Sequence, residues 1–273
     1  MLEKARKWVS EQGYPLEMHT AKVFREAGFD VQQAQLYADS ESGKWREIDL
    51  VVISPDHLGA TRITFAVECK SSSKPWILFT SNVGCAGMSI FWTYSLMSES
   101  ARKVLSDRSW KDPDNRDDPV SIAMFDRLRW LKKRQDTAYS FRQAFSETDA
   151  AYTSLVSSMK AASHLVRPEN PSAFPHFRFA FPIVVVDSPL LLCSLSATNE
   201  VELTQVQSGE ILFTNPDDQK DVACVLVLTI EGLTNFVSEA WSETQQLRKE
   251  FGNAEAILWE QKFGTPMPGQ ADG

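Results

Sequence analysis

Three charged side chains lie in two apolar, strand-like segments of this chain and could act together on one substrate. Asp49 lies in WREIDLVVIS (45–54), and Glu68 and Lys70 lie in TRITFAVECK (61–70). A charge is costly to bury, so an acid inside such an apolar run needs a physical reason. Two carboxylates beside an ammonium group offer oxygen ligands to a hard divalent cation such as Mg²⁺ and a positive charge to a phosphate.

The alternation of side chains along a strand predicts how these groups face one another. In the first segment the face opposite Asp49 is expected to carry three apolar residues: Ile48, Leu50 and Val52. In the second segment Glu68 and Lys70 share a face and are roughly 6–7 Å apart along the strand. If the two segments pair as a hairpin, Asp49 lies across from Glu68, and the backbone carbonyl of Cys69 offers a further oxygen.

This set contains a candidate for each part of phosphodiester hydrolysis. A metal-bound water has a lowered pKa, and Lys70 could orient or deprotonate it while stabilising charge on a phosphate. The plainer alternative is that Glu68 and Lys70 form an exposed ion pair on an edge strand, which contributes little to stability. That alternative leaves Asp49 unexplained. Glu47 is either a further ligand or a solvated acid at the rim.

The order of these residues resembles the PD-(D/E)XK nuclease superfamily. The matching stretches are PLEMHTAKVFREAGF, REIDLVV and FAVECKS, which lie within residues 13–75. The resemblance implies that Asp49 and Glu68 bind the metal, that Lys70 is the catalytic lysine and that Glu17 is the helix acid, which reaches the metal through water. Ile48 stands where the motif has proline, a departure that the family tolerates.

The resemblance also implies a fold and an activity. The fold is a restriction-endonuclease-like α/β core, a mixed β-sheet flanked by helices, here with extra C-terminal strands and a long helical insertion. The activity is Mg²⁺-dependent cleavage of DNA, less often RNA, with Mn²⁺ as a substitute, in a restriction, repair or anti-phage setting. Partners would be nucleic acid and either a second copy of the chain or another protein. The alternative is a catalytically silent nucleic-acid-binding or structural subunit.

The rest of the sequence predicts the elements that hold this site. Helices are expected at 3–12 and 15–28, and strands at 29–39, 45–54 and 61–70. Residues 120–167 lack Gly and Pro and have helical apolar spacing, and SETD at 146–149 could cap a second helix within them. Later strands are expected at 177–187, 190–196, 200–206 and 222–230, followed by a helix at 233–250. We expect one domain over 1–262 and a disordered tail over 263–273.

Candidate nucleic-acid contacts come from two places. RLRWLKKR (127–134) is the most basic segment, and it is either a solvated helix face or a surface that follows phosphates. Two further residues follow directly after the motif. The full set of candidates is Lys74, Trp76, Arg127, Arg129, Lys132, Lys133 and Arg134.

Composition narrows the class of protein. The net charge of the 273 residues is −8, which argues against a protein that coats nucleic acid through bulk electrostatics. The four cysteines form no CxxC pair, so neither disulfides nor a structural zinc is expected, and a reducing cytoplasm is the expected location. The most apolar stretch, 179–196, is interrupted by Pro182, Asp187 and Pro189, so it predicts two buried strands and no membrane span.

Overall fold

The computed structural model describes residues 1–39, 42–56, 61–81, 96–106, 137–167, 177–216 and 222–267. Within these ranges the strands are β1 (Asp30–Ala38), β2 (Trp45–Ser54), β3 (Thr61–Lys70), β4 (Trp76–Thr80), β5 (Leu96–Met97), β6 (Ala138–Gln143), β7 (Phe177–Val186), β8 (Leu190–Leu195), β9 (Val201–Val206), β10 (Ser208–Thr214) and β11 (Val222–Thr229). The helices are α1 (Leu2–Glu11), α2 (Tyr14–Glu26), α4 (Glu99–Ser106), α6 (Ala150–Leu165) and α7 (Ile230–Phe263).

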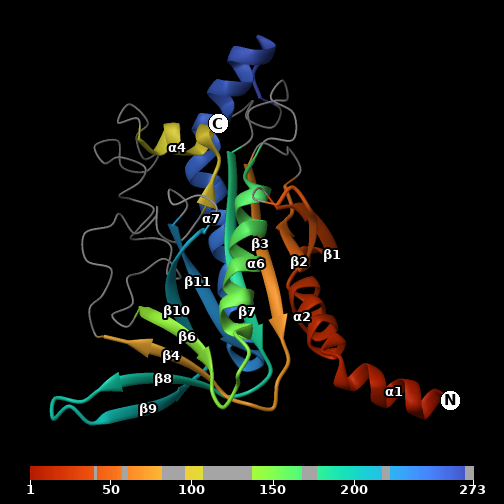
Figure 1. Ribbon diagram of the computed structural model, residues 1–273. Coiled ribbons are helices and arrows are strands. Elements are labelled where there is room, and N and C mark those ends of the chain that lie inside the picture. Colours follow the sequence, from red (N-terminus) through yellow and green to blue (C-terminus); the bar gives the residue numbers. More distant parts are fainter. Residues whose placement is uncertain are drawn as a thin grey trace.

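The strands form one mixed sheet, shown in Figure 1. Its order is β1-β2-β3-β7-β11-β10-β6-β4-β8-β9, and β5 pairs with β7 outside this path. At the centre β3, β7 and β11 are parallel, whereas β1, β2 and β3 form antiparallel hairpins. The prediction of a mixed α/β chain with helices flanking its sheet is therefore confirmed.

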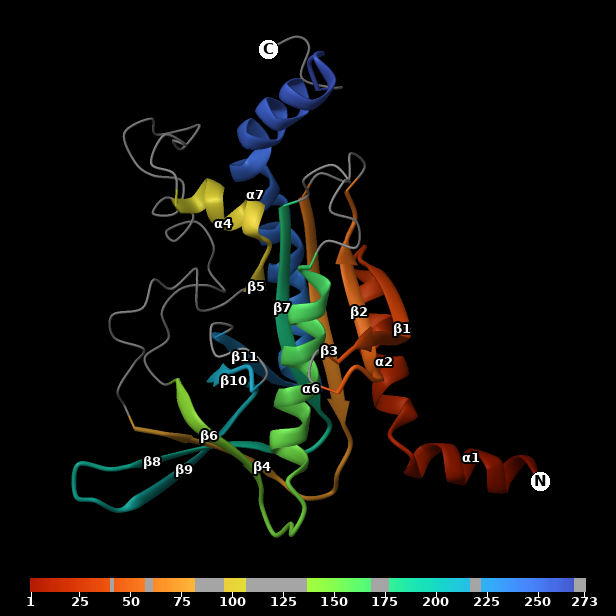
Figure 2. The same cartoon turned by 45° about the horizontal axis from the view of Figure 1, so that its top comes forward.

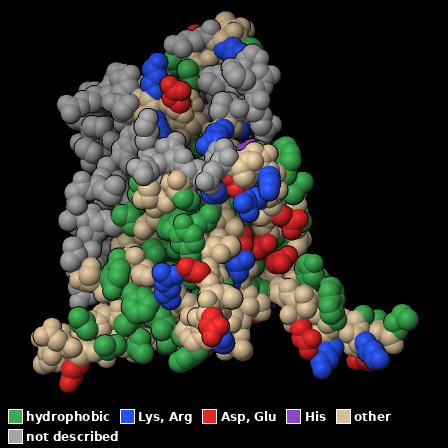
Figure 3. Space-filling view, in the orientation of Figure 1, with side chains coloured by type: hydrophobic (Ala, Val, Ile, Leu, Met, Phe, Trp, Pro, Cys, Tyr) green, Lys and Arg blue, Asp and Glu red, His purple; other side chains and the backbone are tan. Residues whose placement is uncertain are grey.

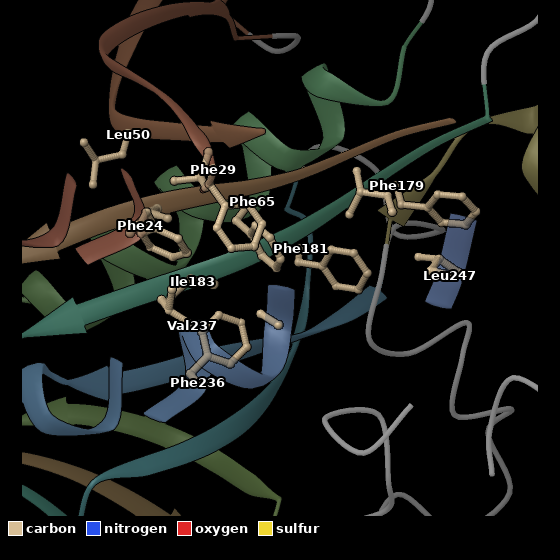
Figure 4. Packing of buried hydrophobic residues seen from close by; sticks show 14 of the residues in the cluster. Phe24, Phe29, Leu50, Phe65, Phe179, Phe181, Ile183, Phe236, Val237 and Leu247 are labelled. Atoms are coloured by element: carbon tan, nitrogen blue, oxygen red, sulfur yellow. The ribbon is translucent and has the colours of Figure 1, made fainter. Parts of the chain in front are cut away.

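Helices α2 and α7 pack on one face of the central strands. Their shared core is rich in phenylalanine, and Figure 4 shows how the rings from α2, β3, β7 and α7 interlock. The Phe65 ring on β3 lies 5.7 Å from the Phe29 ring and 5.7 Å from the Phe236 ring, both edge to face. Such edge-to-face pairs stabilise a core beyond the area that they bury, so this core fixes α2, which carries Glu17, against β3.

Helix α6 covers the opposite face of the same strands, as Figures 1 and 2 show. Asp149 is its N-cap and accepts a hydrogen bond from the Tyr152 backbone N–H at 3.2 Å, so the predicted cap in SETD is confirmed. Met159 and Ala162 of α6 pack in one cluster with Val51 and Ala66 of the sheet. The strands that carry Asp49 and Glu68 are therefore covered on both faces.

Two glycines shape α2 at its ends. Gly13 has φ 82°, a left-handed conformation that suits glycine, and it separates α1 from α2. Gly28 has φ 98° after the last turn, where the Trp241 ring of α7 lies so close that a Cβ atom would be 3.2 Å from it. Pro15 lies in the first turn, as predicted. Both ends of the helix are thus set by local backbone requirements.

Several predicted elements agree with the structure and others do not. The two N-terminal helices, the first three strands and the strands at 177–187, 190–196, 200–206 and 222–230 are confirmed within one or two residues. The prediction of helix throughout 120–167 is wrong for 138–143, which form β6, because pairing with β4 overrides the local helical spacing. Residues 120–136 lie outside the described part. Strands β4, β5 and β10 were not predicted from the sequence.

The C-terminal helix is longer than predicted. α7 runs to Phe263, well past residue 250, and Gly264 closes it in a left-handed conformation. The expected tail is therefore not found at 263–267, where Phe263 ends the helix and Met267 is buried. Residues 268–273 lie outside the described part. None of the helices in the described ranges is both long and apolar enough to cross a membrane.

Candidate functional site

The candidate site lies where β2 separates from β3. The ladder between these strands ends at the pair Leu50–Val67. Beyond that pair the first residues of β2 continue beside β1, up to Trp45 opposite Ala38, while the last residues of β3 continue beside β7, up to Lys70 opposite Val186. If the ladder were continued by one residue, Asp49 would face Glu68. The fork between the two strands thus opens at the two predicted acids.

Asp49 closes the base of this fork. Its Oδ2 accepts a hydrogen bond of 2.7 Å from the Cys69 backbone N–H. The N–H and the carbonyl of one strand residue point to the same neighbouring strand, so the Cys69 carbonyl also leaves β3 on the Asp49 side. Burial raises the pKa of Asp49, while the hydrogen bond from Cys69 and the charge of Lys70 lower it, and the net shift is upward. The Asp49 carboxylate and a backbone carbonyl therefore share one edge of the fork.

Glu68 is a buried carboxylate, only 6% exposed, on the face of β3 that α6 covers. Its Oε1 accepts a hydrogen bond of 2.6 Å from Lys70 Nζ. Its Oε2 is buried and has no hydrogen-bond partner among the described residues. Burial and then the negative charge of Asp49 raise the pKa of Glu68 to about 7, against which the nearby Lys70 acts. An unpartnered carboxylate oxygen in such a place would be stabilised by a cation.

Lys70 is the last residue of β3 and is partly exposed at the mouth of the fork. Burial lowers the pKa of its ammonium group. The charge of Glu68, the hydrogen bond to Glu68 and then the charge of Asp49 raise this pKa, and together they outweigh the effect of burial. The net shift is upward, so Lys70 carries its positive charge at neutral pH. It is therefore suited to stabilising negative charge and not to acting as the base.

Glu17 reaches this group of charges from α2, on the other face of the sheet from α6. Helix α2 is fixed on β3 one turn later, where Cys69 Sγ lies 3.8 Å from the buried Thr20 Oγ1. Burial raises the pKa of Glu17, as do the charges of Asp49 and Glu47, whereas Lys70 lowers it. Figure 3 shows Asp and Glu side chains gathered over β1 and β2. The four predicted site residues are thus within electrostatic reach of one another, and Glu47 acts on Glu17 and Asp49.

The predicted alternation in β2 is wrong at Ile48. Ile48 packs beside Tyr37 in the cluster under α6, whereas Leu50 and Val52 lie in the core under α2 and α7. The change occurs at Asp49, and the residue opposite Asp49 in β1 is Ala34, which has φ 52°. A left-handed residue bends its strand and interrupts the pleat. The apolar side chains of β2 therefore change clusters at the acid, opposite this irregularity in β1.

The donor set at the fork fits a Mg²⁺ ion. No group of three or more His, Cys, Asp or Glu side chains in the described ranges is close enough to hold a metal ion. Mg²⁺ keeps several waters and needs only one or two carboxylates. Asp49 and Glu68 could supply these, with the Cys69 carbonyl as a neutral oxygen. Glu17 would then act only through water, which is the role that the sequence resemblance implies for it.

The residues predicted to contact nucleic acid differ in their exposure to solvent. Trp76 is 1% exposed and stacks on Phe141 with ring centroids 5.3 Å apart, so the prediction that it contacts nucleic acid is wrong. It is the first residue of β4, and its ring fills the core under α6. Lys74 is exposed, and its Nζ donates to the Phe145 carbonyl at 2.5 Å. The five basic candidates in 127–134 lie outside the described residues.

Two residues near the site were not identified from the sequence. Tyr37 is buried at the end of β1, where burial and then the charge of Glu68 raise the pKa of its hydroxyl. Asp187 follows β7 and accepts hydrogen bonds from the Ser71 hydroxyl and, at 2.9 Å, from the Ser72 backbone N–H. Asp187 thereby fixes the turn after Lys70. Neither has a local sequence signal, because both come close to β3 only through strand pairing.

Comparisons of this chain with protein-family models, with curated proteins and with solved structures found no match.

Proposed function

We propose that this chain is a Mg²⁺-dependent nuclease that hydrolyses phosphodiester bonds, with DNA as its substrate class and a restriction-endonuclease-like arrangement of its core. The observation that carries the proposal is the buried Glu68 carboxylate beside Asp49 at the strand fork: one oxygen pairs with Lys70, and the other has no hydrogen-bond partner within the described part of the chain. A buried carboxylate that has a hydrogen bond to only one of its two oxygens among the described residues, and a pKa of about 7, is suited to binding a divalent cation.

Each residue of the proposed site would have a role that follows from its position. Asp49 and Glu68 would hold Mg²⁺ together with the Cys69 carbonyl, and Asp49 is kept in place by the Cys69 N–H. When bound, the ion would lower the pKa of a coordinated water and neutralise charge on the phosphate. Glu17, across the fork on α2, would orient a water of the ion's shell.

Lys70 would act on the phosphate. Its ammonium group lies 2.6 Å from one Glu68 oxygen, so its position is fixed relative to the proposed ion. Because its pKa is raised, it stays charged throughout the physiological range and stabilises negative charge that develops on the phosphate oxygens. It also keeps Glu68 oriented while the other Glu68 oxygen faces the ion.

The test is cleavage of plasmid and oligonucleotide DNA by the full chain with Mg²⁺ or Mn²⁺, compared with EDTA. Lys70→Ala and Asp49→Asn should each lower the rate by about 10²- to 10³-fold. The matched control is Lys22→Ala, a lysine of the same N-terminal region that pairs with Glu26 on the exposed surface of α2. It should leave the rate unchanged.

A silent binding or structural subunit predicts a different result. Such a chain would not cleave, and calorimetry would detect no binding of Mg²⁺ or Mn²⁺ at the fork. Cleavage that survives both Lys70→Ala and Asp49→Asn would remove the assignment of these residues even if the chain proved to be a nuclease.

A further inference from the structure

Two exposed aromatic rings lie beside the fork on the side of α1 and α2. Tyr14 is 48% exposed, and Trp8 is 55% exposed. Their ring centroids are 6.4 Å apart at the joint between the two helices. Tyr14 precedes Glu17 by three residues, which makes them neighbours on the helix surface. At the same joint, a Cβ atom added to Gly13 would lie 3.7 Å from the Ser71 Cβ, so the joint touches the residue that follows Lys70.

A third exposed ring lies on the other side of the same turn. Phe145, at the end of β6, has 86% of its surface exposed and φ 57°. Its carbonyl accepts from Lys74 Nζ, and the neighbouring Ala144 N–H donates to the Pro75 carbonyl at 2.9 Å. Phe145 is thus held against the short connection 71–75 that leads from Lys70 to β4. In Figures 1 and 2 the α1–α2 joint, this connection and the turn after β6 lie at the same end of the molecule.

The state of Phe145 calls for an explanation. A bulky residue with a left-handed backbone is an outlier, and it gains nothing from burial here. Large aromatic faces held in solvent on both sides of the connection that follows the proposed site are suited to stacking with nucleobases. The bases of a duplex already stack on one another, so such rings reach them only where the strand is unpaired.

The charges around the rings point the same way. Binding to a duplex depends mainly on cations that follow its two backbones. Here Lys7 pairs with Glu11 at 3.9 Å, Arg6 pairs with Glu3, and Lys74 is bonded to the Phe145 carbonyl. The carboxylates Glu3 and Glu11 partly offset the cations of α1, so the exposed rings are the distinctive groups among the described residues at this end.

From this arrangement we infer that the site acts on single-stranded or locally unpaired nucleic acid, whose bases stack on Tyr14 and Trp8 on one side of the 71–75 connection and on Phe145 on the other. The inference rests on the proposed nuclease function. It adds the form of the substrate, which the acids and the lysine leave open.

The experiment measures binding by fluorescence anisotropy in EDTA, so that no strand is cut. The probes are a dye-labelled oligothymidylate and a labelled duplex of the same length. The single strand should bind about tenfold tighter than the duplex, and Tyr14→Ala and Phe145→Ala should each weaken its binding by about fivefold or more. Tyr14→Phe and Phe145→Trp should restore it. The loss should persist at higher salt, which weakens phosphate contacts but not stacking.

The matched control is Tyr139→Ala, which should bind like the wild type; this ring lies near the other end of β6, and its exposure of 67% falls between those of Tyr14 and Phe145. Duplex binding as tight as single-strand binding, unchanged affinity in both alanine variants, or no binding of either probe would overturn the inference; the last result would assign the rings to another partner, such as a protein. Single-strand binding through these rings without cleavage in Mg²⁺ would remove the hydrolytic proposal alone. Cleavage of the single strand by Phe145→Ala and Tyr14→Ala at the wild-type rate would remove the stacking inference alone.

Discussion

The Cys69 backbone N–H donates a 2.7 Å hydrogen bond to the Asp49 carboxylate, where a regular β2–β3 ladder would place a backbone acceptor. A side chain therefore ends the pairing of the two strands. The same contact leaves the Cys69 carbonyl on the Asp49 side of the fork. Asp49 thus has a structural role, as the hydrogen-bond acceptor for the Cys69 N–H, and a proposed chemical role, as a metal ligand.

Substitutions of Asp49 can separate its structural role from its proposed role as a metal ligand. Asp49→Asn keeps an oxygen that can accept from Cys69, so its melting temperature should stay close to that of the wild type while Mn²⁺ binding and cleavage are lost. Asp49→Ala leaves the N–H without its acceptor and should cost on the order of 1–3 kcal/mol of unfolding free energy. Calorimetry with Mn²⁺ and urea denaturation measure the two effects. Equal destabilisation by both substitutions would show that the hydrogen bond contributes little.

Lys70 and Glu68 should be energetically coupled. Lys70→Met removes the cation from a buried carboxylate and should destabilise the fold by on the order of 1–3 kcal/mol near pH 8. Glu68→Gln combined with Lys70→Met should cost less than the sum of the single changes, because the double variant leaves no buried charge unpaired. A double-mutant cycle measured by denaturation tests this, and additive effects would argue against the pair. None of the three variants should cleave DNA.

Stability should depend on pH through Glu68 and Glu255, whose folded-state pKa values are both about 7 compared with an ordinary value of 4.5. Burial is the main cause for each. The folded state therefore binds the protons more tightly, so this contribution to stability is complete below about pH 4.5 and is lost as the pH rises through about 7. Thermal melts between pH 4 and 9 measure the loss.

Mg²⁺ should distinguish the contribution of Glu68 to stability from that of Glu255. Above pH 7 the ion should raise the melting temperature of the wild type and of Glu255→Gln, because both keep the Glu68 carboxylate at the fork. It should not raise that of Glu68→Gln. Glu255 instead accepts from the Thr61 hydroxyl at the start of β3, far along the strand from the site. Equal stabilisation of all three proteins would place the ion elsewhere.

Cleavage should follow the ionisation of the metal-binding acids. Mg²⁺ competes with protons for Glu68 and Asp49, whose pKa values are both raised. At limiting Mg²⁺ the rate should therefore increase as the pH rises through about 7, and at saturating Mg²⁺ the midpoint should move to lower pH. Because the pKa of Lys70 is also raised, no fall in rate is expected near pH 8. A rate that is flat from pH 5 to 8 at limiting Mg²⁺ would contradict this assignment.

Part of the site was predictable because its signals are local. The segments 45–54 and 61–70 are apolar and β-branched, and a short turn-forming stretch separates them, so a hairpin was the expected pairing. The positions of Asp49 and Glu68 follow from the register of that hairpin. Glu17 was predictable because Pro15 and Gly28 mark the two ends of its helix.

Other features depend on contacts between distant segments. Trp76 looked like an exposed contact because an aromatic beside Lys74 is ambiguous in sequence, yet pairing of β4 with β6 and β8 buries it under α6. Because residues 138–143 pair with β4, they form a strand where the sequence predicted a helix. Ile48 lies on an unexpected face, next to the position where Ala34 of the neighbouring strand has a left-handed backbone.

The sequence by itself determined which charged groups stand on adjacent segments, because residue type and strand period are properties of the local chain. Only the tertiary structure decided that β2 separates from β3 at Asp49, that one oxygen of Glu68 is buried with no partner in the described ranges and that Phe145 is held beside the turn after Lys70. These depend on β2 pairing with β1, on α6 covering β3 and on β6 pairing with β4. Each of these contacts joins residues far apart in the chain, and burial and strand pairing form only when the whole sheet assembles.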